Sequence, residues 1–262
     1  MPQVDRHVPG DFCWMELATS DQSAGKNFYT SLFGWAPNDI PMGPDSYYTI
    51  FRMNGRDVAA GCTLQPDEVA MHIPPHWNLY ISVDNADASA KKAGELGGKV
   101  IAGPFDVADA GRMAVIQDPT GAYFSLWQPQ RNPGVGIVGD PGAFCWADLN
   151  TPDPDRAGKF YAALFGWKLS LGENDPNGYL HIQNGDKFIG GVPPVQFQNP
   201  NAPPHWLLYF SVADVDVSAA KAKDLGARFF MPPMTIEGVG RFAIMADPQG
   251  AVSAIFTVAE HK

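Results

Sequence analysis

The chain has 262 residues, of which 45% are apolar and 18% charged, so it can bury two cores and is not intrinsically disordered. Its formal net charge of −10 argues against nucleic acids and anionic membranes as partners, because both attract basic surfaces. No apolar run reaches the length of a membrane span, and the first residues lack the apolar core of a secretory signal, so we expect a cytoplasmic protein.

The first half of the chain is predicted to contain several strands and two helices. A strand at residues 12–18 precedes a helix that Ser20 or Asp21 caps and Gly34 ends. An Asn-Gly pair then predicts a hairpin, and an Asp-Pro-Thr-Gly segment predicts a turn between the last two strands. The other strands and the second helix are expected at residues 47–53, 57–64, 77–83, 87–96 (the helix), 112–117 and 122–127.

The second half of the chain repeats the first. Phe12-Cys13-Trp14 returns as Phe144-Cys145-Trp146, and the Pro-Pro-His-Trp segment that ends at Trp77 returns with its end at Trp206. Two homologous domains are therefore expected, at residues 10–128 and 143–260. The Pro- and Gly-rich residues 129–142 between them are expected to form a linker. The mixture of strands and helices predicts the α+β class with mixed sheets.

Three repeated motifs resemble a known superfamily. They are Phe-Tyr-x-x-Leu-Phe-Gly-Trp at residues 28–35, Pro-Pro-His-Trp at residues 74–77 and Asp-Pro-Thr-Gly at residues 118–121. They resemble the vicinal oxygen chelate proteins, such as glyoxalase I, extradiol dioxygenases and the bleomycin and fosfomycin resistance proteins. More narrowly, they resemble a two-domain actinobacterial glyoxalase-like group related to a mycobacterial culture-filtrate antigen. The resemblance implies four βαβββ modules that form two tandem glyoxalase-like domains with cup-shaped mixed sheets, a fold that hosts many chemistries.

In metal-dependent relatives, His, Gln or Glu side chains from the strands of a cup chelate a divalent ion. The resemblance places the ligand positions of the first domain on Trp14, Asn78 and Ser125. The corresponding positions of the second domain hold Trp146, Leu207 and Ala254. None of these side chains is a good ligand for a divalent metal, so we expect neither a metal centre nor a cofactor.

Strand alternation indicates which side chains share each cup. Phe12 and Glu16 are expected beside Trp14, and Phe144 and Asp148 beside the corresponding tryptophan of the second domain. The candidate ligand-binding residues are the aromatic and polar side chains of the cups, Trp14, Asn78, Tyr80, Tyr123, Ser125, Trp127, Trp146 and Tyr209. The candidate catalytic residues are the titratable side chains, Glu16, His76, Asp148 and His205.

The tryptophans and carboxylates of the cups also have structural interpretations. Trp14 and Trp146 either fill a disused cavity or line an aromatic pocket. Glu16 and Asp148 either belong to an ion pair or a hydrogen-bonded network, or they act in general acid–base catalysis. An unpaired charge within an apolar strand is costly, which favours the structural alternative.

If the carboxylates are structural, Arg112 and Arg241 are the candidate partners for an ion pair. His76 and His205 each follow two prolines, and they either cap and pack the strand or transfer a proton together with a tyrosine and a carboxylate. The Asp-Pro-x-Gly segments are interpreted as turns and nothing more.

Three functions remain open. The first is a metal-independent protein that binds a small aromatic or planar molecule between Trp and Tyr side chains. The second is a metal-independent isomerase, lyase or cyclase that uses a cup carboxylate with His or Tyr. The third is a scaffold that acts through protein partners, and a divalent-metal-dependent glyoxalase or dioxygenase ranks lowest. A monomer or a homodimer is expected, and the modules pair either within each domain or between domains.

Overall fold

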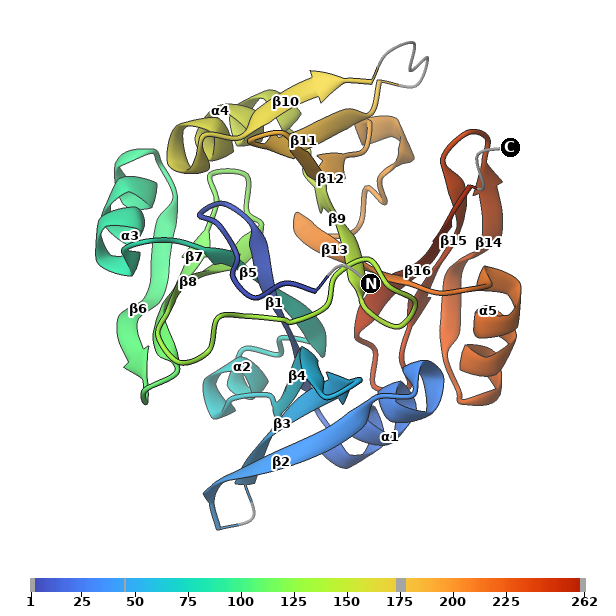
Figure 1. Cartoon of the computed structure of the whole chain (residues 1–262). Helices are drawn as coiled ribbons and strands as arrows, with labels where there is room; N and C mark the ends of the chain where they lie inside the picture. The colour runs from blue at the N-terminus through green and yellow to red at the C-terminus, as the bar shows by residue number, and fades with distance from the viewer. Residues whose placement is uncertain (1–2, 45, 173–177, 260–262) are drawn as a thin grey trace.

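The computed structural model describes residues 3–44, 46–172 and 178–259, and this part contains two sheets of two βαβββ modules each (Figure 1). The elements of the first domain are β1 (Phe12–Thr19), α1 (Gln22–Phe33), β2 (Ala36–Gly43), β3 (Ser46–Met53), β4 (Arg56–Thr63), α2 (Pro66–Ala70), β5 (His76–Ser82), α3 (Ala86–Glu95), β6 (Lys99–Val107), β7 (Gly111–Gln117) and β8 (Tyr123–Pro129). Those of the second domain are β9 (Phe144–Asn150), α4 (Pro154–Phe165), β10 (Lys168–Leu171), β11 (Leu180–Asn184), β12 (Lys187–Val192), the 3₁₀ turn η1 (Val195–Phe197), β13 (His205–Ser211), α5 (Val215–Asp224), β14 (Arg228–Ile236), β15 (Gly240–Ala246) and β16 (Val252–Val258).

The first strands of two modules pair at the centre of each sheet. The first sheet has the order β2-β3-β4-β1-β5-β8-β7-β6, and the second has the order β10-β11-β12-β9-β13-β16-β15-β14. The central pairs β1–β5 and β9–β13 are antiparallel, whereas β1–β4 and β5–β8 are parallel. The modules therefore pair within each domain, and the α+β class with mixed sheets is confirmed.

The helices α1 and α4 begin and end at the residues that favour these boundaries. Asp21 and Asp153 each accept a hydrogen bond from the backbone N–H three residues later, so their carboxylates cap the helix N-termini. Gly34 and Gly166 end the helices with φ angles of 74° and 78°, a left-handed conformation that glycine adopts without strain.

The strands that the sequence pattern does not predict are the edge strands β2, β6, β10 and β14. Pro37 and Pro41 lie within β2, and Pro104 lies within β6. Proline cannot donate a hydrogen bond to a neighbouring strand, which argues against a central strand but is tolerated at an edge. These strands are also largely exposed, so they lack the run of apolar residues that marks the central strands.

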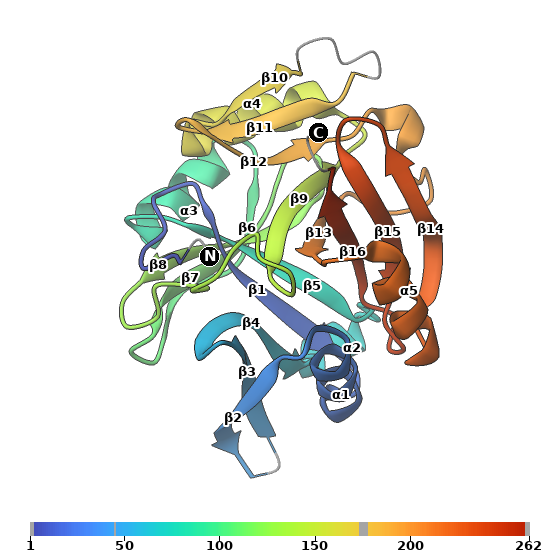
Figure 2. The ribbon, with the colours of Figure 1, turned by 45° about the vertical axis from the view of Figure 1, so that its right-hand side comes forward.

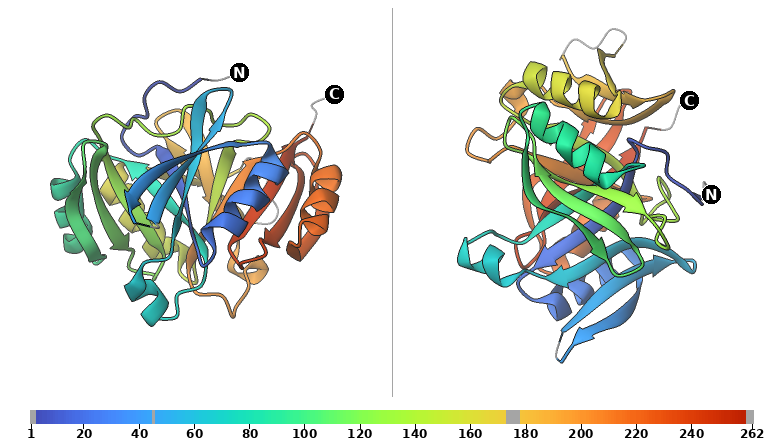
Figure 3. Two further views of the ribbon diagram at one scale, coloured as in Figure 1. Left: turned by 90° about the horizontal axis from the view of Figure 1, so that it is seen from below. Right: turned by 90° about the vertical axis from the view of Figure 1, so that its left-hand side faces the viewer.

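Aromatic side chains join the two domains through one continuous core. The ring of Phe12 lies 5.5 Å from that of Trp167 and 5.4 Å from that of Trp206. Reciprocally, the rings of Trp77 and Phe210 lie 5.0 Å apart. The helices α1 and α5 lie side by side, and so do α3 and α4 (Figures 2 and 3). Each domain thus completes the core of the other.

The Asp-Pro-x-Gly segments do more than turn the chain, which corrects the sequence interpretation. One carboxylate oxygen of Asp118 accepts hydrogen bonds from three backbone N–H groups of its own turn, and the other accepts from Tyr161 of α4 at 2.9 Å. Asp247 holds its turn in the same way and accepts from Tyr29 of α1 at 3.1 Å. Each turn therefore fastens its domain to the first helix of the other domain.

The segment between the domains packs against the first domain. The backbone N–H of Val135 donates to Cys13 at 2.8 Å, and that of Gly136 donates to Asp57 at 2.7 Å. The side chains of Val135 and Ile137 are buried. Residue 260, the predicted end of the second domain, lies outside the described residues. Among the described helices, none has the length and apolar character needed to span a membrane.

Candidate functional site

A bulge at the start of β1 and of β9 decides which side chains reach the cups. The pairing of β1 with β5 shifts between Phe12 and Trp14, and that of β9 with β13 shifts next to Phe144. The extra residue reverses the face of the strand. Phe12 and Phe144 therefore point into the interdomain core, where their ring centroids lie 6.0 Å apart. The expectation that they share the cups is wrong.

We call the face of each sheet that is turned away from its helices the open face. In the first sheet, Gln128 accepts a hydrogen bond from the backbone N–H of Ala86 at the start of α3, so its side chain points toward the helix. Alternation then places its neighbour Trp127 on the open face, where its ring lies 6.1 Å from that of Tyr80. The open face of the first sheet carries Trp14, Glu16, Asn78, Tyr80, Ser125 and Trp127.

The carboxylate of Glu16 is the centre of a hydrogen-bonded cluster on this face. Tyr48 donates to Glu16 Oε2 at 2.6 Å and Tyr80 donates to Oε1 at 3.0 Å. The amide of Asn78, directly opposite on β5, lies 3.5 Å from the same Oε1. The indole Nε1 of Trp14 donates to the Tyr48 oxygen at 3.0 Å. Indole, phenol and carboxylate thus form one chain of hydrogen bonds.

The second domain builds the same cluster around Asp148. Tyr179 donates to Asp148 Oδ1 at 2.5 Å, and Tyr209 donates to Oδ2 at 2.8 Å. The indole Nε1 of Trp146 lies 2.8 Å from the Tyr179 oxygen and 3.1 Å from Asp148 Oδ1. Leu207 stands opposite Asp148 where the first domain has an amide. The second cluster therefore lacks the amide of the first. Its carboxylate is the more buried one, with Asp148 only 5% exposed, whereas Trp146 and Tyr209 are less buried than Trp14 and Tyr80.

Burial shifts the acidity of both carboxyl groups in the same direction. It raises the pKa of Glu16 and of Asp148 above their ordinary values, although the hydrogen bonds from the tyrosines lower it in part. Burial and the adjacent Glu16 carboxylate raise the pKa of Tyr48 and Tyr80 well above the ordinary tyrosine value. These tyrosines therefore keep their protons and act as hydrogen-bond donors.

The two predicted histidines, His76 and His205, donate no hydrogen bond to the carboxylates, although His76 lies close enough to act electrostatically on Glu16. The Nδ1 atoms of His76 and His205 each lie 2.8 Å from the carbonyl oxygen of the proline two residues earlier. His76 Nε2 lies 3.9 Å from Glu68 of α2. Burial lowers the pKa of His205 below its ordinary value, so its ring is neutral at pH 7. This geometry supports a capping and packing role for these two histidines, because tyrosines donate the hydrogen bonds to the carboxylates. Another histidine, His181 of β11, lies beside the second cluster, with its ring 5.1 Å from that of Tyr179 and 6.3 Å from that of Trp146.

Of the remaining predicted residues of the first domain, two are buried on the open face and one is exposed. Ser125 is buried and pairs with Tyr80 in the parallel register of β5 and β8. Trp127 is buried, and its Nε1 donates to the Asn132 carbonyl at 3.0 Å. Tyr123 is 51% exposed at the start of β8, and within the described residues it makes no hydrogen bond or ring contact with the cluster.

The predicted arginine partners are wrong. Arg112 pairs with Asp87 and Asp106, and Arg241 pairs with Asp216, all on the helix side of the sheets. The alternation within β7 and β15 turns these guanidinium groups away from the open faces. The hydrogen-bonded network that the sequence allowed is instead formed with neutral tyrosine, tryptophan and asparagine side chains.

Tyr48 and Tyr179 are not among the residues predicted from the sequence, yet they donate the shortest hydrogen bonds of the two clusters. Each precedes the Asn-Gly turn of its domain, by six residues and by five respectively. This unequal spacing hides the repeat. The presence of a tyrosine before the same turn in both halves is the one signal that points to them.

The donors on the open faces do not fit a chelated divalent ion. The side chains at the ligand positions of the first domain are an indole, an amide and a hydroxyl, and those of the second domain include no hydroxyl or amide. Among the described residues, no group of three or more His, Cys, Asp and Glu side chains could hold a metal ion. The single carboxylate in each cluster already accepts hydrogen bonds on both of its oxygens.

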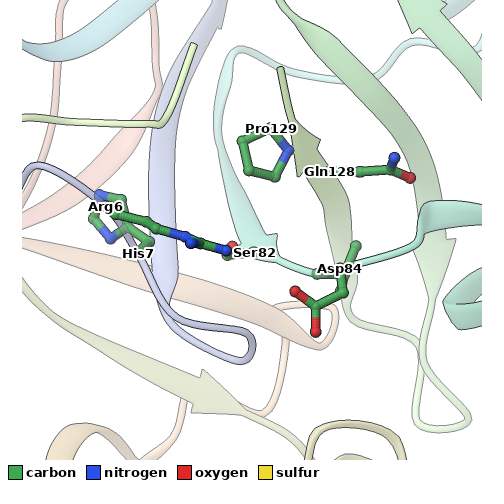
Figure 4. A pocket seen from close by; sticks show the side chains of 7 residues that line it. Arg6, His7, Ser82, Asp84, Gln128 and Pro129 are labelled. Atoms are coloured by element: carbon green, nitrogen blue, oxygen red, sulfur yellow. The ribbon is translucent and has the colours of Figure 1, made fainter. Parts of the chain in front are cut away.

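Two cavities lie away from the clusters. One of about 130 Å³ is lined by Arg6, His7, Ser82, Val83, Asp84, Gln128 and Pro129 (Figure 4). Its histidine Nε2 lies 2.9 Å from the Val135 carbonyl, and burial lowers its pKa. The other, of about 230 Å³, lies between β5, α3 and the end of α4. Neither contains Glu16 or Asp148.

Comparison with known proteins agrees with the repeated architecture. Residues 12–126 match the glyoxalase/bleomycin resistance protein/dioxygenase superfamily, and residues 146–256 match the glyoxalase-like domain family. The chain is 41% identical over 263 aligned residues to the "Putative glyoxylase CFP32" of Mycobacterium tuberculosis, with 97% of each chain covered. It is 32% identical to the anthracycline biosynthesis protein DnrV of Streptomyces peucetius, with 98% of this chain and 96% of that protein covered.

Solved structures share the fold at low sequence identity. The Mn(II)-bound glyoxalase from Novosphingobium aromaticivorans superimposes with a TM-score of 0.65 at 18% identity, covering 95% of this chain and 82% of that one. The 2,3-dioxygenase LapB from Pseudomonas superimposes with a TM-score of 0.67 at 12% identity, covering 98% and 95%. The chain belongs to the glyoxalase/bleomycin resistance protein/dioxygenase superfamily, in which it forms two tandem glyoxalase-like domains.

Proposed function

We propose that the protein binds a small planar or aromatic molecule on the open faces of its sheets, without a chelated metal. The cluster of Trp14, Tyr48, Glu16 and Tyr80 carries this proposal. Glu16, Tyr48 and Asn78 are only half-buried, so the cluster is partly exposed, whereas Trp14 and Trp127 are buried. Aromatic walls with a few convergent polar groups are typical of small-molecule sites.

The names of the relatives support the same class of ligand. Two homologues are anthracycline biosynthesis proteins, and anthracyclines are planar polycyclic aromatic compounds. The aromatic side chains of the open face offer stacking and edge contacts to such a ring system. The hydroxyl and amide groups of the cluster offer hydrogen bonds to its oxygen substituents.

The test is a titration with 1,8-dihydroxyanthraquinone, a neutral planar probe, followed by tryptophan fluorescence and calorimetry. We expect saturable binding, and Tyr48→Ala should weaken it about 10-fold because an aromatic contact and a hydrogen bond are lost. Tyr123→Ala is the matched control, since it removes an exposed tyrosine outside the cluster. Equal affinities of the two variants, or no saturation for the wild type, would contradict the proposal.

A second candidate function is a metal-independent isomerase, lyase or cyclase. The observation that favours it is the raised pKa of Glu16 and Asp148, caused by burial. A carboxyl group with a raised pKa is a stronger base, so it can take a proton from a bound substrate and return it at another atom. Tyr48 would hold the carboxyl group in place through its hydrogen bond. In this case Glu16→Gln abolishes turnover while the affinity for the substrate is kept.

A further inference from the structure

We propose that the carboxylates of Glu16 and Asp148 are counter-ions for a cationic ligand, so that the bound molecule is a planar aromatic compound that carries a protonated amine. This inference rests on the proposed function and names the class of its ligand.

Neither carboxylate forms an ion pair with a lysine or an arginine among the described residues, although the charges of His76 and His181 act on Glu16 and Asp148 from a distance. The ion pairs of this part of the chain involve other acids, and the two arginines of β7 and β15 are engaged on the helix side. Glu16 accepts from two phenols and an amide, and Asp148 accepts from two phenols and an indole. All of these donors are neutral. A buried carboxylate without a counter-ion is costly, so a ligand that supplies the positive charge gains binding energy there.

The direction of the hydrogen bonds shows that Glu16 acts as an acceptor. An indole N–H can only donate, so the Trp14 Nε1 proton occupies a lone pair of the Tyr48 oxygen. The Tyr48 hydroxyl proton is then directed at Glu16 Oε2, 2.6 Å away. The second domain repeats this order from Trp146 through a tyrosine to Asp148. A carboxyl group that accepts on both oxygens is prepared for its ionised form.

The surroundings of the carboxylates also suit a cation. The faces of Trp and Tyr rings attract cations, and aromatic cages of this composition recognise ammonium groups. In the first domain the carboxylate lies among Trp14, Tyr48 and Tyr80. The net charge of −10 adds a long-range attraction for positively charged molecules. Both domains keep the carboxylate, although one has glutamate and the other aspartate.

The experiment compares 2-(aminomethyl)anthraquinone with 2-(hydroxymethyl)anthraquinone, which share the planar ring and differ in one protonated amine. At pH 7.5, calorimetry should show that the amine binds about 10-fold more tightly than the alcohol, the effect of a single charge-assisted contact. The double variant Glu16→Gln with Asp148→Asn should remove the preference, so that the amine and the alcohol bind this variant with equal affinity. Glu95→Gln with Asp109→Asn removes two exposed acidic groups outside the clusters and controls for the change in net charge.

The outcomes separate this inference from the proposed function. If both compounds bind equally and the double variant changes neither affinity, the counter-ion inference is wrong and the planar-ligand site stands. If neither compound binds saturably, both are wrong. Because the double variant could unfold, its far-ultraviolet circular dichroism and melting curve are compared with wild type, and Tyr48→Phe provides a second variant. Tyr48→Phe keeps the charge and should preserve the preference for the amine.

Discussion

The hydroxyl of Tyr29 donates a hydrogen bond of 3.1 Å to Asp247, which lies in the other domain. The same tyrosine oxygen accepts from Trp77 Nε1 at 3.0 Å, so its hydroxyl proton is directed at the carboxylate. The second copy has the corresponding bonds from Trp206 to Tyr161 and from Tyr161 to Asp118. The order indole, phenol, carboxylate thus occurs both between the domains and on each open face.

We expect Tyr29→Phe to lower the free energy of unfolding by about 1–3 kcal/mol, because it leaves a buried carboxylate oxygen without its donor. The urea midpoint measured by tryptophan fluorescence checks this. Tyr161→Phe should behave in the same way, since its bond to Asp118 has the same geometry. Tyr123→Phe, at an exposed position, is the control and should leave the midpoint unchanged. Midpoints equal to this control would show that the interdomain bonds add no stability.

The stability of Glu16→Gln relative to wild type should depend on pH. Burial raises the pKa of Glu16 in the folded state, so the folded protein binds its proton more tightly than the unfolded chain does. Wild type is therefore stabilised at low pH and loses this stability as the pH rises from the ordinary glutamate pKa through the raised one. Glutamine carries no such proton. The free energy of unfolding of the variant should therefore increase relative to that of wild type as the pH rises through this window.

Urea unfolding at several pH values between 4 and 8, the range from the ordinary glutamate pKa to above neutrality, measures this difference. The groups that face Glu16 are Tyr48 on β3, Cys62 on β4, and His76 and Tyr80 on β5. The tyrosines and the cysteine have raised pKa values, so they stay neutral over this range. His76→Gln in the same background removes the contribution of the histidine. A stability difference that is flat with pH would contradict a raised pKa.

The sequence predicts the central strands, the two long helices of each domain and the cap of the first of them, because each of these features depends on residues that are close in the sequence. It does not predict the edge strands, whose prolines and exposed residues carry no periodic signal. The face of Glu16 and Tyr80 follows from alternation, since their strands are adjacent and antiparallel. The predicted face of Phe12 is wrong because of a bulge in β1 that no sequence pattern indicates.

The partners of Glu16 are only partly predictable for a related reason. Tyr80 lies on the strand next to β1, but Tyr48 reaches Glu16 from β3, which lies beyond β4 in the sheet. Its position depends on the register of two pairings, one of which shifts near Phe51. The contact between Tyr29 and Asp247 depends on how the two domains pack, and no local pattern in either segment indicates it.

The protein purified without a tag after growth with added nickel, zinc, iron and manganese should contain well below one divalent ion per chain. The reason is the donor set of the open faces, where indole, leucine and alanine side chains occupy the positions at which the resemblance to metal-dependent proteins places the ligands. Inductively coupled plasma mass spectrometry measures the content, and the melting temperature with and without a chelator is the control. One tightly bound ion per chain would show that other residues supply the ligands.

Asn78 and Leu207 occupy corresponding positions opposite Glu16 and Asp148. Replacing each of them by the residue found in the other domain tests which open face binds the ligand. Asn78→Leu replaces the amide by the side chain that the second domain has at this position, so the fold should tolerate the substitution. If the first domain binds the neutral anthraquinone, the loss of one hydrogen bond should weaken binding about 5- to 10-fold. Calorimetry measures this effect and the stoichiometry together.

Leu207→Asn is the reciprocal variant. It replaces a buried leucine and should lower the free energy of unfolding by about 2–3 kcal/mol, because apolar contacts are lost and a polar group is buried. At a temperature where the variant is folded, the affinity of the first domain for the ligand should be unchanged. The reverse pattern, with binding sensitive to Leu207→Asn and insensitive to Asn78→Leu, would assign the ligand to the second domain. Its more buried Asp148 would then be the carboxylate that meets the ligand.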